Sequence, residues 1–185
     1  MKSLAKLMHN LCLKLYTFFD SNTSRNLIYS YLLKYFNVSP LQACAILGNI
    51  AVESWKTYSS LILQGSNKRN LSYVINYKIK DGKGWGILQW TYYTRKQGLL
   101  NYTNRRNSTL HCNIYNVGDL IIQLEYFNWE RQNTCKNGWN AFKKAKGLNQ
   151  MVRIFCEKYE CAGIPHLAER IAAAKECAKI FGVKY

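Results

Sequence analysis

Apolar residues recur at helical spacing along most of the chain, so the sequence predicts a largely helical protein. Residues 26–36 show this pattern, and a second helix begins with clear N-terminal signals. Ser39 suits the N-cap, Pro40 suits the first helical position, and Gln42 completes a capping box. The buried stripe of this second helix is expected to consist of Ala43, Ile46, Leu47, Ile50 and Ala51.

Between residues 73 and 90 the apolar period changes to two, which is typical of strands. Alternation runs from Tyr73 to Ile79, and Asp81 with Gly82 is a strong hairpin-turn signal. The run GWGILQW follows this turn. The sequence therefore predicts a small β-hairpin between helices.

The rest of the chain is predicted to alternate between loop and helix. Residues 102–118 are polar and rich in Asn, and we expect an exposed loop there. Asp119 is expected to cap a helix that runs to Glu130. Further helices are expected over residues 148–160 and 166–181, the last ended by Gly182. The predicted fold class is mostly α, of α+β type, with one small hairpin.

Residues 1–21 are predicted to form an amphipathic lead-in helix, and residues 22–185 a single domain, since no repeat or Pro/Ser-rich linker divides them. Polar residues interrupt the N-terminal apolar stretch and no A-x-A-like site follows, so no signal peptide is recognised. No run approaches the ~20 apolar residues of a membrane-spanning helix. The lead-in helix is basic and could contact a membrane surface, but packing on its own domain is favoured.

Composition adds a large positive charge, because 26 Lys and Arg face 10 Asp and Glu and give a formal net charge of +16. An apolar fraction of 48% excludes a disordered basic tail. The charge requires an anionic partner, and nucleic acid, an anionic membrane and peptidoglycan all qualify. His111, Cys112 and Cys135 lack the spacing of a zinc finger, so neither a metal nor another cofactor is expected.

Glu53 is the acid in the most informative position. It follows Ile46 by seven residues and Ile50 by three, which places it on the apolar face near the C-terminal end of the second helix. Burial and the helix dipole both disfavour a charged carboxylate there, so we expect a raised pKa. Such a carboxyl group suits the general acid of a glycosidase. The alternative is a buried structural Glu paired with Lys or Arg, and the pattern leaves both open.

The segment KDGKGWGILQWT also carries candidate chemistry. Its glycines let the backbone approach a ligand closely, Trp85 and Trp90 offer flat apolar faces, and Gln89 offers a donor and acceptors. Sugars are bound by this combination of groups. The alternative is a tight hairpin whose two tryptophans lie in the core.

A helix carrying GNIAVES, followed further along by GWGILQWT, resembles the phage tail-type lysozyme domain. That family is related more distantly to goose-type lysozymes and lytic transglycosylases. These enzymes share a Glu-Ser dipeptide at a helix end and a Gly-hydrophobic-x-Gln segment opposite it. The stretch FCEKYECAGIPHLAER fits the closing pattern of the family, and the resemblance covers roughly residues 22–182. It implies a lysozyme-like helical domain whose cleft is lined by the hairpin.

The resemblance implies a muramidase that cleaves the β-1,4 bond between N-acetylmuramic acid and N-acetylglucosamine in peptidoglycan glycan strands. It implies that Glu53 is the catalytic acid and that the sugar cleft is bordered by Ser54, Gln89, Trp90 and Thr91. Most glycosidases use a second carboxylate, for which Asp81 is our candidate, although Asp-Gly geometry alone could explain it. Without a second carboxylate, Glu53 would act as acid and base, and a lytic transglycosylase route to a 1,6-anhydro sugar becomes open.

Glu160 and Arg170 are expected to form a stabilising pair. The rival hypothesis is a basic nucleic-acid-binding virion protein that uses YYTRKQGLLNYTNRR, but no nucleic-acid-binding motif accompanies this segment and Glu53 would stay unexplained. We therefore expect no nucleic-acid partner. The protein is expected to be virion-associated or released to act on the bacterial wall, as part of a phage tail, of another wall-penetrating assembly, or as a freestanding enzyme.

Overall fold

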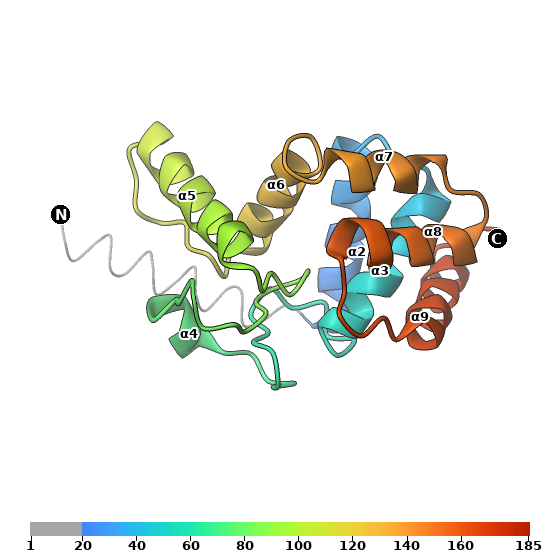
Figure 1. The fold of residues 1–185 in the computed structure, drawn as a ribbon, viewed down its shortest axis with the longest axis horizontal. Coiled ribbons are helices and arrows are strands. Elements are labelled where there is room, and N and C mark those ends of the chain that lie inside the picture. The colour runs from blue at the N-terminus through green and yellow to red at the C-terminus, as the bar shows by residue number, and fades with distance from the viewer. Residues whose placement is uncertain (1–19) are drawn as a thin grey trace.

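Helices build residues 20–185, the part of the chain that the computed structural model describes (Figure 1). The elements are α2 (Ser21–Tyr35), α3 (Pro40–Glu53), α4 (Leu71–Ile75), α5 (Tyr93–Thr109), α6 (Leu120–Glu130), α7 (Lys136–Lys144), α8 (Leu148–Ile154), the π-helical segment η1 (Phe155–Glu160) and α9 (Leu167–Ile180). The predicted lead-in helix falls outside the described residues except at its last two positions, and Ser21 already belongs to α2. Within residues 20–185, no helix is long and apolar enough to span a membrane.

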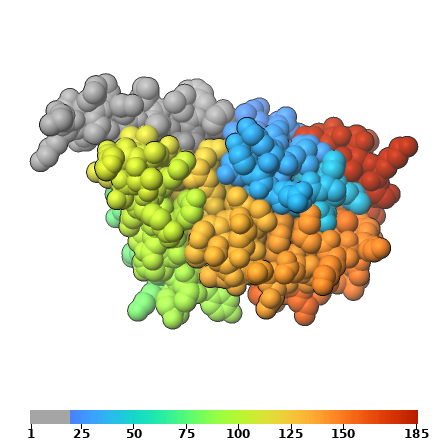
Figure 2. All heavy atoms as spheres, turned by 90° about the horizontal axis from the view of Figure 1, so that it is seen from above, coloured from blue at the N-terminus to red at the C-terminus, as the bar shows by residue number. Residues whose placement is uncertain are grey.

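The helices form two groups, with α4 and α5 on one side and α2, α3, α8 and α9 on the other (Figure 1). Helix α6 lies between the groups and contacts both α5 and α2. Seen from above, side chains fill the space between the region of α5 and the regions of α2 and α7 (Figure 2).

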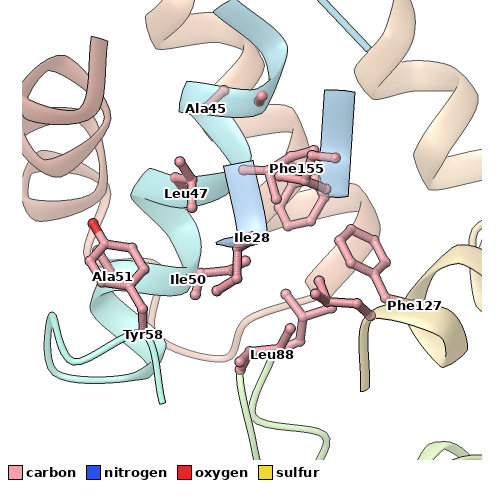
Figure 3. Packing of buried hydrophobic residues seen from close by; sticks show 14 of the residues in the cluster. Ile28, Ala45, Leu47, Ile50, Ala51, Tyr58, Leu88, Phe127 and Phe155 are labelled. Carbon is pink, nitrogen blue, oxygen red and sulfur yellow. The ribbon is translucent and has the colours of Figure 1, made fainter. Parts of the chain in front are cut away.

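Helix α3 is the central element, because every side chain from Gln42 to Ala51 is buried. Figure 3 shows part of this packing, with Ile50 of α3 close to Ile28 of α2. The predicted capping box is confirmed: Ser39 Oγ accepts from the Gln42 N–H at 3.2 Å, and Gln42 Oε1 accepts from the Ser39 N–H at 3.1 Å. The predicted start of this helix is therefore correct.

Close packing of α9 on α3 positions the C-terminal end of α3. It depends on Gly48, since a Cβ atom there would lie 2.6 Å from the carbonyl oxygen of Arg170 and 2.8 Å from the nitrogen of Ala174. The absence of a side chain at Gly48 lets the two helix backbones approach each other. Arg170 is thereby brought to the helix end that carries Glu53.

The predicted β-hairpin is wrong, because the described residues contain no β-strand. The first half of the predicted hairpin holds the short helix α4, whose N-cap Asn70 accepts from the Tyr73 N–H at 3.0 Å. The second half is a compact turn in which Trp85 and Trp90 exchange backbone hydrogen bonds of 3.1 and 3.3 Å. Only an isolated bridge links Leu63 to Trp85. Apolar residues that alternate over so short a segment do not distinguish a strand from irregular backbone held in place by buried aromatic side chains.

The predicted loop over residues 102–118 is wrong in its first half, because α5 continues to Thr109 and has a buried face of Lys96, Leu99 and Thr103. Helix α7 was not predicted. The other helical predictions are confirmed by α2, by α8 with η1, and by α9, and Asp119 occupies the N-cap position of α6.

Candidate active site

Glu53 is the last residue of α3, and its side chain is 19% exposed. Its Oε1 accepts a short hydrogen bond from Nη2 of Arg170 in α9. The carboxylate therefore lies at the edge of the core, partly open to solvent, and belongs to an ion pair. This is the pairing that the sequence left open as an alternative for Glu53, and it holds the carboxylate in a fixed position.

Arg170 is buried, with a side chain only 1% exposed, and each nitrogen of its guanidinium has a partner. Nη1 donates to Glu160 Oε2 at 2.6 Å and to Asn49 Oδ1 at 2.9 Å, while Nε donates to the carbonyl oxygen of Pro165 at 2.7 Å. The predicted pair of Glu160 and Arg170 is thus confirmed. Held in this way, the guanidinium presents one edge to Glu53.

Glu160 ends η1, and its side chain is 4% exposed. Burial raises the pKa of the Glu160 carboxyl; Arg170 lowers this pKa in part, and the charge of Glu53 raises it further. Its Oε1 is buried without a hydrogen-bond partner. One guanidinium is therefore shared by two carboxylates, of which Glu160 is enclosed and Glu53 is open to a ligand.

Ser54 directly follows Glu53 and is completely buried. Its Oγ donates to the carbonyl oxygen of Ile50 at 2.7 Å and accepts from the Tyr58 N–H at 2.9 Å. The hydroxyl therefore ends α3 and holds the next turn, which positions Glu53 from the backbone side. The following residue, Trp55, is 62% exposed and was not among the residues predicted for the site. An aromatic residue one position beyond a Glu-Ser pair was the signal that could have identified it.

Asp81 is enclosed by donors. Lys96 Nζ donates to its Oδ1 at 2.6 Å, the Lys83 N–H donates to the same oxygen at 3.1 Å, and the Tyr73 hydroxyl donates a short hydrogen bond to Oδ2. Burial raises the pKa of Asp81, but the hydrogen bonds from Lys96 and Tyr73 outweigh it and lower that pKa to about 2. Both oxygens of an ionised carboxylate are thus engaged, which favours a structural role.

Trp85 and Trp90 are fully buried. Trp85 Nε1 donates to the carbonyl oxygen of Val117 at 3.0 Å, and Trp90 Nε1 donates to Glu130 Oε2 at 3.2 Å. The exposed indole faces predicted for sugar binding are therefore not present, because both rings pack in the core. This outcome matches the structural alternative for the two tryptophans.

Gln89 and Thr91 lie at the surface end of the same segment. Gln89 Nε2 donates to the carbonyl oxygens of Ile62 at 3.1 Å and Gly86 at 2.8 Å, which fixes the local fold. Thr91 is exposed and lines a shallow cavity of about 330 Å³, whose other lining residues are Ile79, Lys80, Gly82, Tyr92 and Tyr93. Tyr92 and Tyr93 are 67% and 58% exposed. Aromatic surface open to a sugar is thus present next to the predicted segment, on residues that were not predicted.

The family model described as phage tail lysozyme matches residues 23–181, the region that contains both Glu53 and Arg170. The chain belongs to the phage tail lysozyme family. Membership implies that the protein degrades peptidoglycan, suggests a glycoside-hydrolase activity and suggests association with a virion. Searches of curated proteins and of solved structures find no match. Among the described residues of this lysozyme domain, no three His, Cys, Asp or Glu side chains are grouped so as to hold a metal ion.

Proposed function

We propose that the protein is a muramidase that cleaves the β-1,4 bond between N-acetylmuramic acid and N-acetylglucosamine, with Glu53 as the general acid. The observation that carries this proposal is the placement of Glu53 at the end of a buried helix, fixed by Arg170 and yet 19% exposed. Glu130 and Glu160 are enclosed at 0% and 4% exposure, and Asp81 is engaged through both oxygens. Glu53 thus combines a fixed position with access to a substrate.

In the proposed reaction Glu53 donates a proton to the glycosidic oxygen as the bond to the leaving sugar breaks. The carboxylate that remains is stabilised by Arg170, which donates to it from a buried and fully hydrogen-bonded position. Glu53 then acts as the base that takes a proton from the attacking water molecule. Asn49 and Glu160 contribute indirectly, because they hold the guanidinium in place.

A second candidate is cleavage of the lytic transglycosylase type, and the engagement of both Asp81 oxygens favours it. In that route the C6 hydroxyl of the muramic acid residue attacks its own anomeric carbon, and Glu53 removes the proton. The product then carries a 1,6-anhydro end. In hydrolysis, water attacks instead and the product carries a reducing end.

We assign substrate contacts to the cavity lined by Thr91, Tyr92, Tyr93 and Lys80. Two tyrosine faces suit pyranose rings, and the exposed ammonium of Lys80 suits the acidic groups of the wall polymer. Glycan strands are therefore the proposed partner, and the proposed setting is a phage tail that opens the wall. Mass spectrometry of purified virions tests that setting, and absence of the protein from them would favour a freestanding enzyme.

The nucleic-acid hypothesis finds less support, because three of the four basic residues of its segment pair with carboxylates of the protein itself. Arg95 pairs with Glu130 at 2.7 Å, Lys96 pairs with Asp81 at 2.6 Å, and Arg106 pairs with Glu125 at 3.2 Å. The segment forms helix α5, and these pairs leave fewer cations to contact phosphates.

The deciding experiment is digestion of purified peptidoglycan by the parent and by Glu53→Gln, followed by mass spectrometry of the muropeptides. Loss of a general acid is expected to slow digestion by roughly 10²–10⁴-fold. Glu157→Gln serves as the matched control, because Glu157 is exposed on η1, and it should keep the parental rate. Parental activity in a folded Glu53→Gln variant would refute the assignment, and the ends of the fragments distinguish hydrolysis from anhydro-sugar formation.

A further inference from the structure

The turn after Glu53 places a tryptophan where helices commonly place glycine. Helix α3 ends in a Schellman motif: the Lys56 N–H donates to the carbonyl oxygen of Ala51 at 2.6 Å, and the Trp55 N–H donates to that of Val52 at 3.4 Å. Trp55 is the C′ residue of this motif, and its φ of 54° lies in the left-handed region. A bulky side chain disfavours that conformation, whereas glycine adopts it freely. Local backbone preference therefore opposes Trp at this position.

Burial does not offset this cost. Trp55 is 62% exposed, whereas Trp85 and Trp90 are fully buried. Tyr58 gives an instructive contrast within the same turn, because its φ is also 54° but its ring is buried and its hydroxyl contacts Cys177 Sγ at 3.3 Å. Core packing accounts for the conformation of Tyr58, and Trp55 has no comparable compensation in the core.

Hydrogen bonds on either side hold the turn in this conformation. The buried Ser54 Oγ links the end of α3 to Tyr58, and the Thr57 N–H donates to the carbonyl oxygen of Ser54 at 3.0 Å. Strained residues that the surrounding structure fixes in place cluster at active sites and ligand-binding sites. Since only Ser54 separates Trp55 from Glu53, the indole and the carboxylate project from the same helix end.

We infer that Trp55 is a substrate-binding residue whose indole stacks on a pyranose ring of an N-acetylhexosamine in the strand that Glu53 cleaves. An indole offers the largest flat apolar face among side chains, and pyranose rings present an apolar face that matches it. The inference rests on the proposed function, because it takes Glu53 as the acid that cleaves this strand. It adds a sugar contact in the turn after α3, separate from the cavity lined by Tyr92 and Tyr93.

This role predicts opposite changes in stability and binding when Trp55 becomes glycine. Glycine adopts the left-handed conformation at position 55 without the steric cost that Trp55 bears, so Trp55→Gly should raise the melting temperature by about 2 °C. The same change removes the stacking surface, so the affinity for glycan should fall roughly three- to tenfold. Trp55→Phe keeps an aromatic face and the strain, so it should keep most of the binding and none of the stabilisation.

The experiment measures binding of the full chain to insoluble peptidoglycan in a Glu53→Gln background, and KM and kcat in the active background. Tyr185→Ala is the matched control, since Tyr185 is 64% exposed, and it should change neither quantity. A tetramer of N-acetylglucosamine should protect the parent, but not Trp55→Phe, from quenching of tryptophan fluorescence by acrylamide. The expected result for Trp55→Gly is a raised melting temperature, weaker binding and a raised KM with kcat retained.

A lower melting temperature for Trp55→Gly would show that the indole stabilises the fold, and it would overturn the inference. Unchanged binding and KM would overturn it equally. Failure of the proposed function gives a different result, because Glu53→Gln would then digest peptidoglycan at the parental rate. If Glu53→Gln is inactive while Trp55→Gly binds normally, the acid assignment stands and only the role of Trp55 is lost.

Discussion

The buried ammonium of Lys96 makes the role of Asp81 directly testable. Lys96 is fully buried, and its Nζ donates to Asp81 Oδ1 at 2.6 Å, to the Tyr73 hydroxyl at 2.6 Å and to the carbonyl oxygen of Lys83 at 3.0 Å. Among these three acceptors Asp81 supplies the negative charge. Asp81→Asn would leave a buried cation without its counter-ion, which is costly in a protein interior. We therefore expect this variant to lose stability and to keep the catalytic step.

The magnitude follows from the pKa of Asp81. Burial raises this pKa, but the hydrogen bonds from Lys96 and Tyr73 lower it to about 2 from an ordinary 3.8. At 1.36 kcal/mol per unit this difference corresponds to about 2 kcal/mol of folding free energy. For a chain of this size the expected fall in melting temperature is about 4–8 °C. Because the pKa is depressed in the folded state, this stability is present above pH 3.8 and is lost as the pH falls towards 2.

Urea unfolding of the parent and of Asp81→Asn, at pH 7 and at steps down to pH 3, measures the contribution of the Asp81 charge to the free energy of unfolding. The two proteins should differ by about 2 kcal/mol at pH 7, and the difference should narrow to about 1 kcal/mol at pH 3. Glu157→Gln is the control, because Glu157 is exposed on η1, and it should leave the stability at the parental value across this range. Parental stability of Asp81→Asn together with lost wall digestion would refute the reasoning and make Asp81 the second catalytic carboxylate.

Two further substitutions test how α9 supports Glu53. Gly48→Ala would place a methyl group 2.6 Å from the carbonyl oxygen of Arg170, so α9 should move away from α3. Both the melting temperature and the rate of wall digestion should then fall. Parental values of both would contradict the close packing of the two helices. Arg170→Lys keeps the charge, but the three N–H donors of an ammonium cannot replace the four hydrogen bonds that Arg170 makes to Glu53, Glu160, Asn49 and Pro165. We therefore expect kcat to fall with little change in KM, and parental kinetics would contradict a positioning role.

Local signals were sufficient to predict most helices. Ser39, Pro40 and Gln42 fix the start of α3 through contacts within four residues, which is why the sequence specifies them. Helix α7 was missed because its sequence contains a glycine that weakens the helical pattern. A tertiary contact explains why position 138 is a glycine, because a Cβ atom there would overlap the carbonyl oxygen of Lys158 in η1. The reason for that residue lies outside its own helix.

In the candidate site too, some residues could be predicted from local sequence and others depend on contacts between distant parts of the chain. Glu53 could be identified because a carboxylate on the apolar stripe of a helix violates the local pattern. Its partner Arg170 lies 117 positions away along the chain, and no periodicity reports a contact over that distance. The predicted hairpin failed for a related reason. Tyr73 and Asp81 take their positions from the buried ammonium of Lys96 in α5, so a distant charge decides the conformation of that segment.

Many acidic side chains are buried in ion pairs, and this leaves the exposed Lys and Arg to attract an anionic polymer. Within residues 20–185, the carboxylates that pair with Lys or Arg include those of Glu53, Asp81, Glu125, Glu130, Glu160 and Glu176. Five of these six side chains are less than a fifth exposed, so little of their negative charge opposes an approaching anionic polymer. Attraction by exposed Lys and Arg is screened over about 10 Å at 0.1 M salt, whereas the buried pairs are screened much less. Exposed Lys and Arg therefore serve retention on the wall, whereas the buried Arg170 supports Glu53. Added salt should weaken retention on the wall more than it weakens the ion pair of Glu53.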